Sequence, residues 1–144
     1  ELYISVNKGR DADKSFQDRV SLPRYSTWRA ATHSGLFPWG NSKASCSYAV
    51  YFDRAPSCTG LLRPQVVCSH PRGNTENGAC DLSGNLWEWV KPNRSTSTET
   101  ALIVGGAWSS AAIDLKSSSK REKLKATRDP SIGIRLVYSH YVGR

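Results

Sequence analysis

The sequence predicts a single α+β domain with a small antiparallel sheet, one or two helices and long ordered loops. Three observations favour this fold class: helical spacing over residues 22–35, a few short apolar runs of strand length, and a middle region, residues 37–79, rich in Pro, Gly, Ser and Asn. At 144 residues and 38% hydrophobic content the chain can form one modest core, so we take residues 1–144 as one domain.

The N-terminal part predicts one strand and one helix. Residues 2–6 alternate apolar and polar side chains as a strand does, and the chain then turns polar up to residue 19. Pro23 suits the first turn of a helix, Trp28 and Ala31 follow at helical spacing, and Gly35 ends the pattern. A helix is therefore expected between Pro23 and Gly35.

The long middle loops contain all four cysteines of the chain, Cys46, Cys58, Cys68 and Cys80. Loops of this length usually need disulfides or bound metals to be ordered. An even, clustered count favours disulfides; a zinc site usually uses close pairs, whereas these cysteines are ten to twelve residues apart, and free thiols are the third option. Of three connectivities we expect Cys46–Cys58 and Cys68–Cys80, because each closes a short loop.

Disulfides imply an oxidising compartment, so we expect a secreted or cell-surface protein. The sequence contains no Met, which removal of an N-terminal leader would explain. No apolar run reaches the 18 residues of a membrane span.

The C-terminal third predicts two strands separated by a polar stretch. Residues 101–104 form the first apolar run and lead into the sequence GGAW at 105–108, and residues 132–138 form the closing run. Between them lies a Ser- and Lys-rich stretch with six of the 20 Lys and Arg residues of the chain, at 116–128. With a net charge of +8, this segment suits an acidic protein, an anionic surface or nucleic acid, and it could also be a solvated loop.

Several separated motifs resemble those of one protein family, and they occur in the family's order. Residues 22–41 resemble its helix followed by a Pro-Trp-Gly-Asn turn, residues 81–89 (DLSGNLWEW) resemble its most specific motif, and residues 105–108 and 133–137 resemble its closing elements. This is the sulfatase-modifying-factor family, which includes formylglycine-generating enzymes, ergothioneine-pathway sulfoxide synthases and the variable proteins of diversity-generating retroelements. The match covers about residues 20–138, and the family's N-terminal part is abbreviated or missing. The resemblance implies a C-type-lectin-like fold of the formylglycine-generating-enzyme variant.

The motif at 81–89 also implies a calcium site. Two carboxylates with a Gly between them offer hard oxygen ligands of the kind that calcium prefers. The resemblance implies the side chains of Asp81 and Glu88 and the carbonyls of Gly84 and Leu86 as ligands. In the alternative interpretation, Asn85 and Glu88 bind loop backbone while the two tryptophans of the motif pack in the core.

The catalytic residues of the family's enzymes are not found in this sequence. The oxidases hold copper with two cysteines, which is a soft-ligand requirement, and by alignment from Trp108 these positions are Ser110 and Leu115. The sulfoxide synthases bind iron through three histidines, and the three histidines here lack that arrangement. We therefore expect neither copper nor iron, no catalytic residues, and a protein that is not an enzyme.

A binding function is the leading hypothesis. In the retroelement variable proteins the interval after the Gly-Gly-x-Trp element carries the ligand contacts, and a loop can vary on a rigid scaffold at little stability cost. A protein or glycan ligand of acidic character is expected at the loop 109–128, through Trp108, Ser109, Ser110, Ala111, Ile113, Asp114, Lys116, Ser118, Ser119, Lys120, Glu122, Lys123 and Lys125. The first alternative is a divergent or partner-dependent oxidase. The second is a nucleic-acid binder, which is less favoured because interleaved aromatic residues are missing.

Arg135 lies near a glycine at the closing strand, and we interpret it as a structural residue. We expect a buried or half-buried guanidinium paired with a carboxylate, with no catalytic role.

Overall fold

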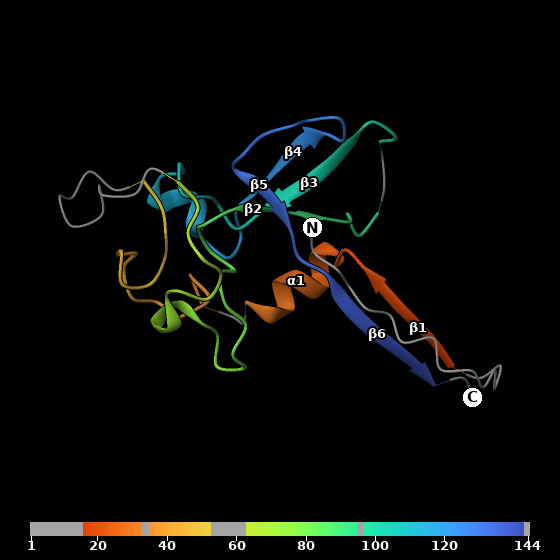
Figure 1. Cartoon of the computed structure of the whole chain (residues 1–144), viewed down its shortest axis with the longest axis horizontal. Coiled ribbons are helices and arrows are strands. Elements are labelled where there is room, and N and C mark those ends of the chain that lie inside the picture. The colour runs from red at the N-terminus through yellow and green to blue at the C-terminus, as the bar shows by residue number, and fades with distance from the viewer. Residues whose placement is uncertain (1–15, 33–34, 53–62, 95–96, 143–144) are drawn as a thin grey trace.

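Two sheets organise the part of the chain that the computed structural model describes, residues 16–32, 35–52, 63–94 and 97–142 (Figure 1). The larger sheet contains β2 (Trp87–Val90), β3 (Thr100–Val104), β4 (Lys120–Leu124) and β5 (Ile132–Ile134), in the order β4-β3-β2-β5. The α+β class is confirmed. The expectation of an antiparallel sheet holds for β2-β3 and β3-β4, but β2 and β5 are parallel. The reason is that residues 125–131 carry the chain from one edge of the sheet to the other.

A second, two-stranded sheet extends away from the first (Figure 1). It pairs β1 (Phe16–Ser21) with β6 (Val137–Val142) in antiparallel register. The single closing strand predicted over residues 132–138 is thus two strands, β5 and β6, which belong to different sheets. The strand predicted at residues 2–6 lies outside the described residues.

The predicted helix is present as α1 (Tyr25–Ala31), two turns long. No side chain of its own caps its N-terminus, where Arg24 is the cap residue. Instead the segment after β2 supplies acceptors: the backbone N–H of Tyr25 donates to the Lys91 carbonyl, and that of Ser26 donates to Oδ1 of Asn93. So short a helix is marginal alone, and these contacts hold it against the sheet.

The motif at 81–89 connects three parts of the chain through its backbone. Gly84 N–H donates to the Gly105 carbonyl, Asn85 N–H donates to the Val50 carbonyl, and the Asn85 carbonyl accepts from Trp108 N–H. Gly84 has φ +79°, and a Cβ there would lie 2.5 Å from the Val50 oxygen. A glycine is therefore required where the motif passes the middle loop.

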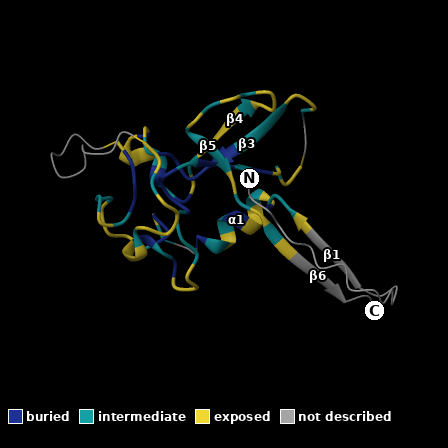
Figure 2. Cartoon of the chain, viewed as in Figure 1, coloured by how far each residue is buried: buried dark blue, intermediate teal, exposed yellow. Residues whose placement is uncertain are grey.

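Buried residues gather where β2 and β3 meet α1 and the irregular loops (Figure 2). One cluster places Trp28 of α1 against Leu82, Val90 and Val104. A second joins Phe37, Ala49, Tyr51 and Leu115 from the loops, and a third surrounds Trp87 and Ile103. The loops therefore carry core residues as the strands do, which is why they can be long and still ordered.

The middle region consists of loops, as predicted, with one 3-10 turn, η1 (Pro71–Gly73), among its described residues. The predicted disulfide Cys68–Cys80 is present, with the two Cα atoms 5.2 Å apart. Cys46 is also disulfide-bonded, and Cys58 lies outside the described residues. Among the described residues, no helix has the length and apolar character needed to cross a bilayer.

Candidate functional site

An apolar groove of about 730 Å³ lies beside the turn that follows β3. Its lining comes from three segments far apart in the sequence: residues 36–44, residues 51–52, and residues 111–116, which include the 3-10 helix η2 (Ala112–Leu115). Phe37 and Tyr51 are buried at its base, while Leu36, Phe52 and Ile113 are exposed on its walls. Exposed apolar side chains that gather around one hollow indicate a binding surface.

Backbone hydrogen bonds hold the walls of the groove together. Phe52 N–H donates to the Ser110 carbonyl at 2.9 Å, and Ser117 N–H donates to the Leu36 carbonyl at 2.9 Å. Asn41 accepts from Leu36 N–H through Oδ1 at 3.0 Å, which closes the turn on the first wall. The groove is therefore preformed by the fold.

Stacked aromatic rings hold Phe37, one of the buried residues of the groove lining. Trp39 lies between Phe37 and Tyr48, with ring centroids 4.9 Å and 5.1 Å apart and nearly parallel planes. The indole N–H of Trp39 donates to the Ser42 carbonyl. These contacts fix the Pro-Trp-Gly-Asn turn, and with it the position of Phe37 at the base.

The charges at the groove are of one sign. Lys43 and Lys116 line it, and no carboxylate is among the described residues of its lining. Lys43 is exposed and Lys116 is half-buried. An apolar group flanked by a negative charge would complement this surface.

The residues predicted to bind ligand divide into four groups in the structure. Ala111, Ile113 and Lys116 line the groove. Lys120 and Glu122 lie on β4 and line a separate hollow of about 430 Å³ near α1. The predicted loop 109–128 is thus not one loop, since it contains both η2 and the edge strand β4.

A further group of the predicted residues supports the local structure. The Ser110 hydroxyl accepts from Ala107 N–H, and the Ser119 hydroxyl donates to the Ile113 carbonyl. Asp114 pairs with Arg121 at 2.7 Å. Trp108 packs beside the third core cluster. The remaining predicted residues are exposed or half-buried outside the groove lining: Ser109, Ser118, Lys123 and Lys125.

The sequence did not predict two of the three segments that line the groove, residues 36–44 and 51–52. Leu36, Lys43 and Phe52 come from segments that the sequence marks only as loop. The short apolar run at residues 48–52 was the available signal, because an apolar run inside a polar loop must either enter the core or form a surface patch. Tyr51 does the first and Phe52 the second.

The two positions that correspond to the oxidases' copper cysteines both face the interior. Ser110 is buried, and Leu115 is fully buried in the second core cluster. The Leu115 carbonyl also accepts a 2.6 Å hydrogen bond from the Ser83 hydroxyl. These positions therefore serve the packing of the turn. The Cys68–Cys80 disulfide lies in another part of the chain, next to the motif at 81–89.

Three of the four predicted calcium-ligand residues, Asp81, Leu86 and Glu88, line one hollow of about 270 Å³, and both carboxylates have protein partners there. Oε1 of Glu88 accepts from Arg135, Oε2 accepts from Arg135 and from the Trp28 indole, and Asp81 accepts from Cys68 N–H through Oδ2. In the described part of the chain, the one group of three potential metal-ligating side chains within 4.8 Å is Cys68, Cys80 and Asp81, without Glu88. Calcium binding stays a prediction.

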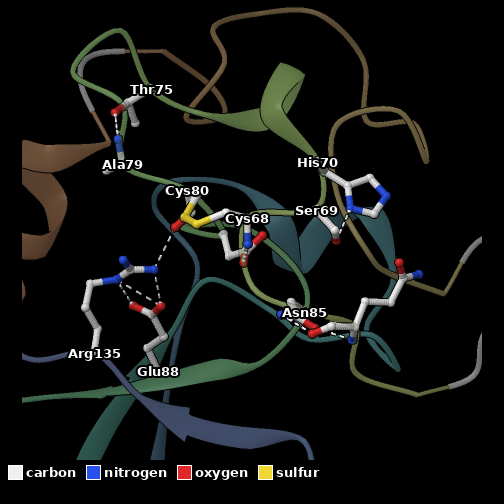
Figure 3. Close-up of a disulfide and its surroundings, with 11 residues drawn as sticks. Cys68, Ser69, His70, Thr75, Ala79, Cys80, Asn85, Glu88 and Arg135 are labelled. Carbon is white, nitrogen blue, oxygen red and sulfur yellow. Dashed lines mark hydrogen bonds and ion pairs between the residues drawn. A yellow bond between two sulfur atoms is a disulfide. The ribbon is translucent and has the colours of Figure 1, made fainter. Parts of the chain in front are cut away.

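Arg135 pairs with a carboxylate, as its structural interpretation predicted. Its guanidinium is half-buried and lies 2.6 Å from Glu88, whose side chain is buried (Figure 3). Asn85 also behaves as the alternative interpretation of the motif expects, because its side chain exchanges hydrogen bonds with the backbone of Gln65. Of the two tryptophans, Trp87 is buried and Trp89 is half-buried.

Hydrogen bonds stabilise the ionised form of the Asp129 carboxylate, at the turn before β5. The Ser131 hydroxyl and then the Ser131 backbone N–H donate to Asp129 and lower the pKa of its carboxyl, with a smaller contribution from the charge of Lys123 opposing the effect of burial. Asp129 precedes β5 and shapes the turn into it, since Ile132 N–H donates to its carbonyl. This carboxylate lies outside the groove lining.

The sequence of the chain matches the model of the sulfatase-modifying factor enzyme 1-like domain over residues 7–140. The chain therefore belongs to this family. A comparison with curated proteins finds no match.

Solved structures with the same fold include three proteins of low sequence identity. Variable protein 1 of Treponema denticola is 20% identical with a TM-score of 0.68, and the match covers 85% of this chain and 48% of that protein. CarF is 21% identical with a TM-score of 0.66, covering 81% and 46%. PvdO from Pseudomonas aeruginosa is 20% identical with a TM-score of 0.67, covering 83% and 52%. These matches establish the C-type-lectin-like fold, and the chain spans about half the length of each neighbour.

Proposed function

We propose that this chain is a non-catalytic recognition domain that binds a protein ligand in the apolar groove beside η2. The observation that carries the proposal is the groove itself: three exposed apolar side chains, Leu36, Phe52 and Ile113, surround one preformed hollow. A partner that covers these clustered apolar side chains would remove them from water, which favours binding.

Two observations support a binding role over a catalytic one. The positions of the oxidases' copper cysteines hold Ser110 and Leu115, and both side chains are buried. Among the solved structures of the same fold is a variable protein, although CarF and PvdO share the fold as well. We therefore assign the groove to recognition.

The composition of the groove favours a peptide segment over a glycan. Its base is formed by Phe37 and Tyr51, which are buried, and its polar groups are few. Lys43 and Lys116 at its margin favour acidic side chains beside the apolar anchor. Because these lysines are partly exposed, the association should weaken as salt rises. The disulfides further support a protein that functions in an oxidising compartment.

The test is selection from a phage-displayed random peptide library on the immobilised protein. We expect enrichment of peptides that combine a large apolar residue with Asp or Glu. Ile113→Asp should lower the affinity for the selected peptides by about tenfold or more, because it places a charge where an apolar side chain should be buried.

Val66→Asp is the matched control, because Val66 is more exposed than Ile113 and lies outside the groove. It should leave peptide binding unchanged. Absence of enrichment, or peptides that bind both variants equally, would contradict the proposal. Binding on a glycan array that Ile113→Asp abolishes would replace the peptide with a sugar as the ligand.

A further inference from the structure

Hydrogen-bond donors contact both oxygens of the Glu88 carboxylate, and Figure 3 shows the contacts from Arg135. Arg135 donates from Nε to both carboxylate oxygens, at 3.0 and 2.9 Å, and from Nη2 to Oε1 at 2.6 Å. The Trp28 indole N–H donates to Oε2 at 2.8 Å. Glu88 is only 7% exposed, so a charge at this position needs a partner.

The same guanidinium also reaches a backbone oxygen. Nη2 of Arg135 donates to the Cys80 carbonyl at 2.8 Å. Arg135 is therefore bound by two carboxylate oxygens of β2 and one carbonyl oxygen of the disulfide-closed loop. Carboxylate and carbonyl oxygens are also the ligands that a hard metal cation takes in proteins.

We infer that the Arg135 guanidinium is the cation of this motif, and that it replaces calcium as the charge that neutralises Glu88. A calcium ion on Glu88 would have to displace at least one of the donors that fill its oxygens. It would also place a double positive charge next to the Arg135 guanidinium. The domain should fold and remain stable without metal.

Arg135 also has a mechanical consequence that a diffusible ion would not share. It lies between β5 and β6, Glu88 lies on β2, and Cys80 lies at the end of the disulfide-closed loop. The guanidinium thus connects three segments of the chain, and it is covalently part of one of them. The connection forms as soon as the C-terminal segment docks, independent of the calcium concentration.

The experiment compares melting temperatures in EDTA and in 5 mM calcium chloride, at about 0.15 M ionic strength, for the wild type, Arg135→Gln and Arg121→Gln. The wild type should melt at the same temperature in both, within about 1 °C. Arg135→Gln should lower Tm by roughly 10 °C, because it leaves a buried carboxylate without its cation. Arg121→Gln removes an ion pair whose arginine side chain is 53% exposed, and it should lower Tm by about 2 °C or less.

Two results would overturn the inference. One is a rise in wild-type Tm of more than about 2 °C on adding calcium, and the other is an Arg135→Gln variant that loses no more stability than Arg121→Gln. If Arg135→Gln does not fold, Arg135→Lys provides the second measurement. Lysine keeps the charge but not the paired geometry. The Arg135→Lys variant should therefore fold with a Tm below that of the wild type, and this Tm should not respond to calcium.

Discussion

The Cys68–Cys80 disulfide should be a major source of stability for the middle loops. We consider replacement of both cysteines by alanine. The polar contacts made here by these two residues are backbone contacts, since Cys68 N–H donates to Asp81 and the Cys80 carbonyl accepts from Arg135. Alanine keeps both, so the variant removes the covalent link and little else.

The magnitude follows from the length of the closed loop. The sequence separation is 12 residues, for which the loss of chain entropy in the unfolded state amounts to about 3 kcal/mol. Urea unfolding followed by tryptophan fluorescence measures this difference in the free energy of unfolding. With an m-value of about 2 kcal/mol/M, the midpoint should fall by about 1.5 M.

Conditions matter for this measurement, because Cys46 is also disulfide-bonded. The comparison is made without reductant, so that the remaining bridge is kept in the wild type and in the variant. A loss below about 1 kcal/mol would refute the reasoning. It would mean that the contacts between the loop and residues 81–85 already restrict the unfolded chain, or that the link is not formed.

Two further predictions concern local geometry. Gly84→Ala should destabilise the fold by about 2–4 kcal/mol in the same urea assay, because its Cβ would lie 2.5 Å from the Val50 oxygen at a positive φ; a loss below 1 kcal/mol would show that the loop yields freely. Asp129→Asn should cost under about 1 kcal/mol at pH 7, and the cost should disappear as pH falls below about 4. The sign follows because hydrogen bonds from Ser131 lower the pKa of the folded carboxyl, so stability from the ionised form is present above the unfolded pKa and lost in acid; a pH-independent difference would contradict it.

The helix and the family motifs could be recognised from the sequence because their signals are local. Pro23, Trp28 and Gly35 mark a helix by spacing and by backbone preference, and α1 lies between the first and last of them. The motif at 81–89 requires a glycine at a position fixed by its own backbone. Even the pairing of Arg135 with a carboxylate followed from the rule that a buried charge needs a partner.

β4 shows why other elements could not be predicted. Its sequence, KREKL, has no apolar alternation, since it is an edge strand with charged side chains on its surface. Its hydrogen bonds come from β3, to which it pairs over its full length. Pairing with a strand 20 residues earlier, and not its own composition, makes this segment a strand.

The sequence by itself determined the fold class, the family, the helix, the disulfide-rich loops and the absence of thiols at residues 110 and 115, because each depends on residue types at short or family-defined spacing. Only the tertiary structure decided which side chains line the groove proposed as a binding site and which carboxylate Arg135 meets. Leu36, Phe52 and Ile113 form one groove because backbone hydrogen bonds join segments more than 50 residues apart. Arg135 meets Glu88 across 47 residues for the same reason. Such contacts depend on how the whole chain closes, which no local pattern encodes.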